Sequence, residues 1–168
     1  MKIISTVIYL LFFLSGCATT NVSSFIDPEY ANEIYKMPIV WGRIAPLEDR
    51  QKLEGGIVAK FSSKGINAIL GTAVFPPTRD ITKEFIASAL SKTEGDSLLI
   101  VALKEGSSIY SMKYEATLYG KSLHKVWVGS VVTKLQSGGF SESQKNDAVF
   151  DSTAHGIVDQ IMKDGVIK

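Results

Sequence analysis

The pattern of apolar and polar residues divides the chain from residue 37 onward into eight segments of regular structure. Five segments have the short apolar or alternating pattern that is typical of β-strands; they are residues 38–44, 66–75, 97–103, 109–119 and 125–135. Three segments carry apolar residues at helical spacing; they are residues 46–64, 81–92 and 146–163. The predicted element order is therefore β-α-β-α-β-β-β-α.

The polarity of the individual strands predicts how they are arranged. Residues 97–103 are apolar almost without interruption, which is typical of a central parallel strand with both faces buried. Residues 109–119 alternate between polar and apolar, so one face of this strand meets water. Right-handed crossovers favour a mixed sheet in the order 2-1-3-4-5, with the first two helices on opposite faces and the last helix over the closing hairpin. We therefore expect an α/β fold, a three-layer helix-sheet-helix sandwich.

The first predicted helix contains two adjacent glycines and several acids. Gly55 and Gly56 each cost about 1 kcal/mol relative to alanine in a helix. They indicate either close packing of the helix on the sheet or a weak, kinked helix, and the sequence does not separate the two. Glu48, Asp49 and Glu54 are interpreted as helix-start and surface charges.

The N-terminal segment has the anatomy of a signal peptide. A positive charge at Lys2 is followed by an almost wholly apolar run, which ends at the one cysteine in the chain. The four residues at this junction resemble the lipobox of bacterial lipoproteins; they are Leu14, Ser15, Gly16 and Cys17. The resemblance implies cleavage before Cys17 and acyl chains, palmitate among them, on its sulfur and amino group. Such chains would hold the protein to a membrane.

Two other interpretations of this segment are open. A transmembrane helix needs about 20 apolar residues, and only about a dozen precede Cys17. An ordinary secretory signal cleaved near Ala18 would discard Cys17 or leave it as a lone thiol. The lipoprotein interpretation is preferred because it explains both the number and the position of the cysteines. Ala18 carries no retention cue of the Asp type, so resemblance to enterobacterial lipoproteins implies the inner leaflet of the outer membrane, facing the periplasm.

The sequence predicts three regions. Residues 1–16 form the signal peptide, residues 17–36 form the lipidated cysteine and a flexible tether, and residues 37–168 form a single globular domain. The tether is predicted because residues 18–36 are rich in threonine, serine and asparagine and lack a sustained apolar period.

The charge of the chain bears on the classes of partner it can bind, and its cysteine content bears on how the fold is stabilised. Once the signal peptide is removed, basic and acidic residues are equal in number, and no basic cluster is present. The sequence therefore gives no electrostatic footprint for nucleic acid and no polybasic patch for anionic lipid. With one cysteine there are no disulfides within the chain, so the core must hold the fold unaided.

No catalytic set is evident from the sequence. His124 is predicted to be a solvated residue of a hairpin loop. His155 lies on the last helix between Asp151 and Asp159, a spacing that is more typical of an exposed helix face than of a metal site. The sequence contains neither a nucleophile elbow nor a glycine-rich phosphate loop. We predict no enzyme, cofactor or metal site, although sequence analysis does not detect carboxylates that pair only in space.

Three local features, together with the element order, resemble a group of small envelope proteins. They are the helix that ends at Gly65 before a strand, the apolar strand introduced by Gly95-Asp96, and the turn flanked by Leu118-Tyr119 and Val126-Trp127. The group comprises the N-terminal domain of TolB, CsgG and LpoB. The resemblance spans about residues 37–167 and implies the fold described above. The two long strands lack the insertions with which CsgG builds a pore, which argues against a channel.

The preferred functional hypothesis is a non-catalytic accessory or interaction module that docks on another envelope protein. Tyr119 and Trp127 flank the hairpin turn and form the possible interaction surface, because clustered aromatics on a sheet edge can anchor a partner. Aromatic residues are also simply preferred in strands. The alternative is a binding protein for a lipid or glycan fragment, with an apolar pocket between the last helix and the sheet. A hydrolase with an unrecognised site is the third hypothesis.

Overall fold

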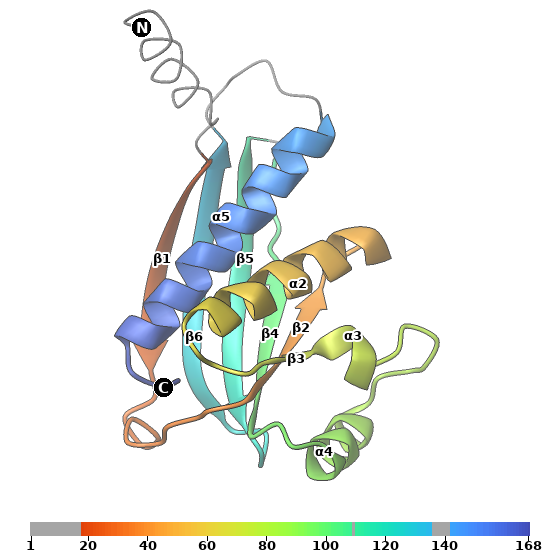
Figure 1. The fold of residues 1–168 in the computed structure, drawn as a ribbon, viewed down its shortest axis with the longest axis vertical. Coiled ribbons are helices and arrows are strands. Elements are labelled where there is room, and N and C mark those ends of the chain that lie inside the picture. Colours follow the sequence, from red (N-terminus) through yellow and green to blue (C-terminus); the bar gives the residue numbers. More distant parts are fainter. Residues whose placement is uncertain (1–17, 109, 136–141) are drawn as a thin grey trace, which may run out of the picture.

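The computed structural model describes residues 18–108, 110–135 and 142–168. These residues form one six-stranded mixed sheet and four helices (Figure 1). The strands are β1 (Ala18–Ile26), β2 (Pro38–Arg43), β3 (Ile69–Leu70), β4 (Ser97–Leu103), β5 (Ser111–Gly120) and β6 (Lys125–Leu135). The helices are α2 (Leu47–Ser63), α3 (Gly71–Val74), α4 (Lys83–Lys92) and α5 (Glu142–Lys163).

The sheet has the strand order β1-β6-β5-β4-β2-β3. The strand β2 runs parallel to β3 and β4, whereas β4, β5, β6 and β1 pair antiparallel in turn. The predicted α/β class and mixed sheet are confirmed, and the five expected strands follow the predicted order 2-1-3-4-5. The sixth strand, β1, lies beyond the hairpin.

The strand β1 corrects the prediction of a tether, because residues 18–26 pair with β6 over nine positions, from Ala18 opposite Leu135 to Ile26 opposite Trp127. Its inner side is partly apolar, through Val22 and Ile26, and partly hydroxyl. Thr20 Oγ1 lies 2.8 Å from both Thr133 Oγ1 on β6 and Ser152 Oγ on α5. Satisfied hydroxyls can be buried without penalty, so a polar segment forms an ordinary edge strand.

The second predicted strand is much shorter than expected. Of residues 66–75, only Ile69 and Leu70 pair with β2, and the chain then turns into α3 at Gly71. A Cβ atom at Gly71 would lie 2.5 Å from the carbonyl oxygen of Val40, so the glycine permits a contact that no other residue allows. This close approach, rather than strand propensity, decides the local conformation.

The larger part of the core lies between one face of the sheet and the helices α2 and α5, which cross in front of it in Figure 1. Side chains from every long strand and both helices fill this space; they include Val40, Leu99, Leu118, Trp127, Val131, Leu53, Phe61, Ile157 and Ile161. Gly56 of α2 faces α5, where a Cβ atom would lie in van der Waals contact, 3.4 Å from Cβ of Ala154. Gly56 therefore lies at the contact between the two helices, whereas Gly55 faces open space, since a Cβ atom there would meet nothing within 4 Å.

A smaller cluster lies on the opposite face of the sheet. Ile39, Trp41 and Leu98 pack there against Phe75 and against Leu90 of α4. The first three residues belong to β2 and β4, the strands next to α4 in Figure 1. Farther along the same face, exposed residues of β5, β6 and β1 meet solvent; they include Lys113, Ser130, Lys134, Ser23 and Phe25. This half of the face is called the open face below.

Candidate functional site

The edge strand β1 presents a row of backbone groups that are unpaired within the described residues. The N–H of Asp27 donates to the carbonyl oxygen of Val126. Since the pairing alternates along an antiparallel strand, the N–H and C=O groups of Thr20, Val22 and Ser24 point away from β6. The strand contains neither a charged residue nor a proline, the devices that commonly protect a free edge.

The edge also carries an exposed aromatic residue. Phe25 is 64% exposed on the open face. The strand registers place it beside Val128, then Thr117, then Ile100 of β4. Val128 and Ile100 are half-buried. A mostly apolar row therefore crosses the open face from the free edge toward α4.

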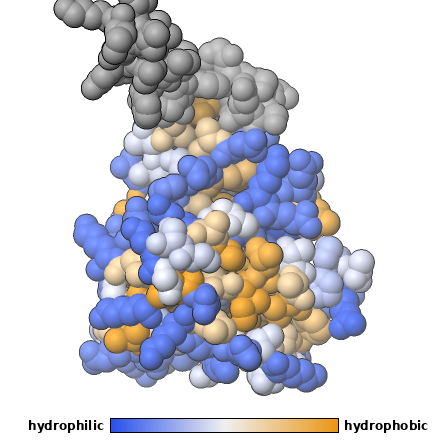
Figure 2. All heavy atoms as spheres, in the orientation of Figure 1, coloured by the Kyte–Doolittle hydropathy of each residue, from blue (hydrophilic) through white to orange (hydrophobic). Residues whose placement is uncertain are grey.

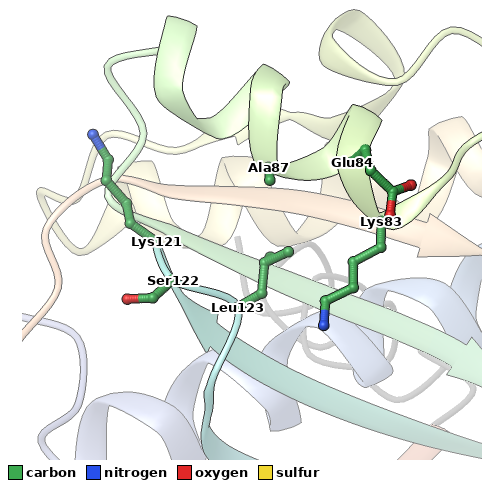
Figure 3. A pocket seen from close by; sticks show the side chains of 6 residues that line it. All are labelled: Lys83, Glu84, Ala87, Lys121, Ser122 and Leu123. Atoms are coloured by element: carbon green, nitrogen blue, oxygen red, sulfur yellow. The ribbon is translucent and has the colours of Figure 1, made fainter.

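A groove lies at the other end of this row, between α4, the sheet and the β5–β6 turn. Its volume is about 330 Å³. The apolar part is made by Leu98, Ile100, Tyr119, Ile86 and Leu123, and Arg43 and Lys83 complete the lining. A second hollow of about 370 Å³ adjoins it through Lys83 and Leu123 and adds Glu84, Ala87, Lys121 and Ser122. In Figure 3, Leu123 points from the turn toward Ala87, and Lys83 reaches from α4 toward the sheet.

A polar cluster fixes the β5–β6 turn from its other side. His124 Nε2 lies 3.1 Å from Glu33 Oε2, and the ring of Tyr30 lies 4.0 Å from the His124 ring. The Tyr35 hydroxyl donates to the same Glu33 oxygen. These hydrogen bonds lower the pKa of Glu33, whereas burial and Glu33 raise the pKa of Tyr35. His124 was predicted to be a solvated turn residue, but it contacts the segment that follows β1.

The predicted interaction surface of Tyr119 and Trp127 is wrong, because the two side chains lie on opposite faces of the sheet. Trp127 is fully buried in the larger core, and its Nε1 donates to Asp164 Oδ2 at 2.7 Å. Tyr119 is half-buried and lines the groove beside α4. Thus one of the two residues contributes to a candidate site, and it does so from the face that Trp127 does not reach.

The space between the last helix and the sheet, where an apolar pocket was predicted, is filled with core side chains. Trp127 and Val131 of β6 pack there with Ala154, Ile157 and Val158 of α5. The groove described above lies on the other side of the sheet. The lipobox residues Leu14, Ser15 and Gly16 and the proposed lipidation site Cys17 lie outside the described residues.

The histidine and carboxylates of α5 make contacts within the fold. In the described part of the chain, no group of three histidine, cysteine, aspartate or glutamate residues is placed to hold a metal. On α5, His155 Nδ1 lies 3.0 Å from the carbonyl oxygen of Asp151, and Asp159 turns instead to Lys64 at 3.2 Å. Among the described residues, no helix is sufficiently long and apolar to span a membrane.

Glu54 differs from its interpretation as a surface charge. It is wholly buried, and its carboxylate accepts hydrogen bonds from the backbone N–H of Gly42 at 2.9 Å and of Thr72 at 2.8 Å. The Thr72 hydroxyl donates to the same carboxylate. Glu54 therefore connects α2 to β2 and to the start of α3, and its oxygens are occupied by these structural contacts.

Neither the free edge nor the groove was predicted from the sequence. Phe25 is an isolated aromatic in a polar segment, and its uncharged neighbours were the available signal for an unprotected edge. The groove cations Arg43, Lys83 and Lys121 come from three separate elements. Their proximity is a product of the sheet order, so no local motif announces it.

Comparison with solved structures shows the fold. The PelC dodecamer from Paraburkholderia phytofirmans has a TM-score of 0.51 at 13% identity, covering 89% of this chain and 99% of that chain. The dodecamer of its L103M variant has a TM-score of 0.52 at 13% identity, covering 83% of this chain and 96% of that chain. Lipoprotein GNA1162 from Neisseria meningitidis has a TM-score of 0.48 at 12% identity, covering 76% of this chain and 96% of that chain. No family model and no curated protein matches this chain.

The class that these findings define is a small α/β domain with the fold of PelC. At this identity the likeness concerns the fold alone. The resemblance to TolB, CsgG and LpoB stays a prediction.

Proposed function

We propose that this chain is an envelope lipoprotein whose domain serves as a non-catalytic interaction module. In this proposal, acyl chains on Cys17 hold it to the inner leaflet of the outer membrane, and the partner is an envelope protein. The observation that carries the docking role is the uncharged free edge of β1 with Phe25 exposed beside it.

The anchor and the folded domain are adjacent in the chain. The strand β1 begins at Ala18, the residue directly after Cys17. With about 3.3 Å per strand residue, β1 extends roughly 30 Å from the anchor to Ile26. The β5–β6 turn lies at the far end, because Ile26 pairs with Trp127. Lipidation of Cys17 would therefore set the groove at the end of the domain away from the membrane.

The partner that fits the β1 edge is an extended protein segment. Strand addition to a sheet edge supplies backbone hydrogen bonds, and side-chain contacts supply specificity. Here the backbone groups of Thr20, Val22 and Ser24 would form the bonds, and Phe25 would provide an apolar contact. The two PelC structures are dodecamers, so a second copy of this chain is included among the partners to be tested.

The anchor is tested by growing cells that express the full chain with an alkyne analogue of palmitic acid. The proposal predicts alkali-resistant and alkali-labile label on the wild-type protein, as an amide-linked chain and the ester-linked chains of a diacylglyceryl group on the sulfur give, and sedimentation with outer membranes. The Cys17→Ser variant should lose both the label and the sedimentation with outer membranes. Unlabelled wild-type protein, or a Cys17→Ser variant that keeps its label, would contradict lipidation at this residue.

The docking edge is tested on the same membranes by chemical cross-linking. The wild-type protein should form a discrete product that Phe25→Lys abolishes, because a charge at a free edge opposes strand addition. Leu47→Lys is the matched control, since Leu47 is also exposed, at 41%, but lies on α2. A product that survives Phe25→Lys while Leu47→Lys removes it would place the interface elsewhere.

A further inference from the structure

We propose that the groove between α4 and the sheet binds a single-chain amphiphile with an anionic head group, of the fatty-acid or lysophospholipid type. The inference rests on the lining of the groove and its charges, and it is independent of the docking edge. It gives a location and a chemical class to the ligand-binding alternative that the sequence left open.

The apolar part of the groove suits a hydrocarbon chain. Four apolar residues that line the groove are only half-buried; they are Ile86, Ile100, Tyr119 and Leu123. Their remaining apolar surface is in contact with water in the free protein. Covering such surface contributes about 25 cal/mol per Å², and a volume of about 330 Å³ lies within the range of small-molecule sites.

The charges around the groove select an anionic head group. Arg43 borders the larger apolar part, Lys121 borders the adjoining hollow, and Lys83 lines both. Within the described residues, none of the three forms an ion pair, whereas Lys52, Lys64 and Lys104 elsewhere do. The one acid in the lining is Glu84. The balance of charge is therefore positive, in a chain whose overall charge is close to zero.

The elements that form the groove hold the cations in different ways. Arg43 stands at the end of β2, 5.7 Å from the Trp41 ring centroid, which favours a fixed guanidinium. Lys83 begins α4, where the capping threonine Thr82 accepts from the Phe85 N–H. Lys121 stands on the turn and points outward in Figure 3. Because Lys83 lines both the groove and the adjoining hollow, it can bind a carboxylate or a phosphate whose chain lies on the apolar lining, with Arg43 in the groove and Lys121 at the hollow as further cations.

The experiment uses membranes that contain the full chain and a palmitic acid analogue that carries a diazirine and an alkyne. Illumination should produce adducts in the peptides of α4 and β4, which line the groove. Unlabelled palmitate or lysophosphatidate should compete, and whichever competes better identifies the head group as carboxylate or phosphate. Methyl palmitate, which has the chain without the charge, should not compete.

Charge reversals then test the cations. Lys83→Glu and, independently, Lys121→Glu should each lower the adduct yield about tenfold, equivalent to about 1.4 kcal/mol. Lys92→Glu is the matched control on α4, because Lys92 is exposed and lies outside the lining. Thermal unfolding of each variant confirms that the fold is retained.

Three outcomes would overturn the proposal. They are adducts confined to peptides outside the groove, equal competition by methyl palmitate, and full labelling of both charge-reversed variants. The first would indicate contact with bulk membrane lipid.

Discussion

Replacing Glu54 by glutamine should destabilise the domain although the two side chains have nearly the same shape. The carboxylate of Glu54 accepts from the backbone N–H of Gly42, the backbone N–H of Thr72 and the Thr72 hydroxyl. Glutamine offers one acceptor oxygen, and its NH₂ group would face a backbone donor. At least one buried N–H therefore loses its partner.

The size of the effect follows from these contacts. An unsatisfied buried donor costs about 1–3 kcal/mol, and removal of a buried charge returns part of that cost. We expect the free energy of unfolding to fall by about 2 kcal/mol, which lowers Tm by about 4–8 °C for a domain of this size. Glu48→Gln is the matched control on the same helix, since its side chain is 77% exposed and pairs with Lys52 at the surface.

The assay is thermal and urea unfolding of the full chain, monitored by circular dichroism. The reasoning is refuted if Glu54→Gln and Glu48→Gln unfold together with the wild type. That result would mean that the buried carboxylate does not hold β2 and α3 to α2.

Three further predictions concern other parts of the domain. Tyr114→Phe should leave stability unchanged or raise it by about 1 kcal/mol, because the buried hydroxyl has no partner among the described residues; a Tm lowered by several degrees would show that the hydroxyl is bonded. Gly156→Ala should cost about 1–3 kcal/mol in urea unfolding, because its Cβ would lie 2.5 Å from Thr20 Cγ2 and push α5 off β1; equal midpoints would contradict this packing. The lowered pKa of Glu33 means that its carboxylate contributes stability above its unfolded-state pKa and loses it as the pH falls through the lower folded-state pKa. The Tm difference between wild type and Glu33→Gln should therefore shrink between pH 6 and 3, and a constant difference would contradict the assignment.

The central part of the fold could be predicted because its hydrophobic pattern is local. Residues 98–103 are apolar without a break and lie in the central strand β4, and the two long strands that follow form the expected hairpin. Right-handed crossovers then restricted the order of the parallel strands. Periodicity and chain connectivity together were sufficient here.

The strand β1 could not be predicted from periodicity, since its inner side is partly polar. Thr20 and Ser24 face α5 and are satisfied by Ser152 and Asp164. These partners lie 132 and 140 residues away in the chain. A segment whose burial depends on such distant hydroxyl and carboxylate groups has the composition of a linker.

The positions of single residues in the candidate site also depend on contacts that the local sequence does not show. Trp127 and Tyr119 lie on either side of a turn, and sequence proximity suggested one aromatic surface. The pairing shifts between Leu118 and Tyr119, which turns Trp127 to the core face, and Asp164 accepts its N–H there. Neither the irregularity nor the acceptor is visible in the local sequence.

The most direct test of the docking edge places a photoreactive benzoylphenylalanine at position 25 of the full chain in living cells. Position 47 on α2 carries the same residue in the control strain, because Leu47 is also exposed. The account predicts a light-dependent adduct of discrete mass from position 25 and none from position 47. An adduct of twice the chain mass would identify a second copy as the partner. Absence of any adduct at position 25, or the same adducts at both positions, would contradict an interaction module that docks through β1.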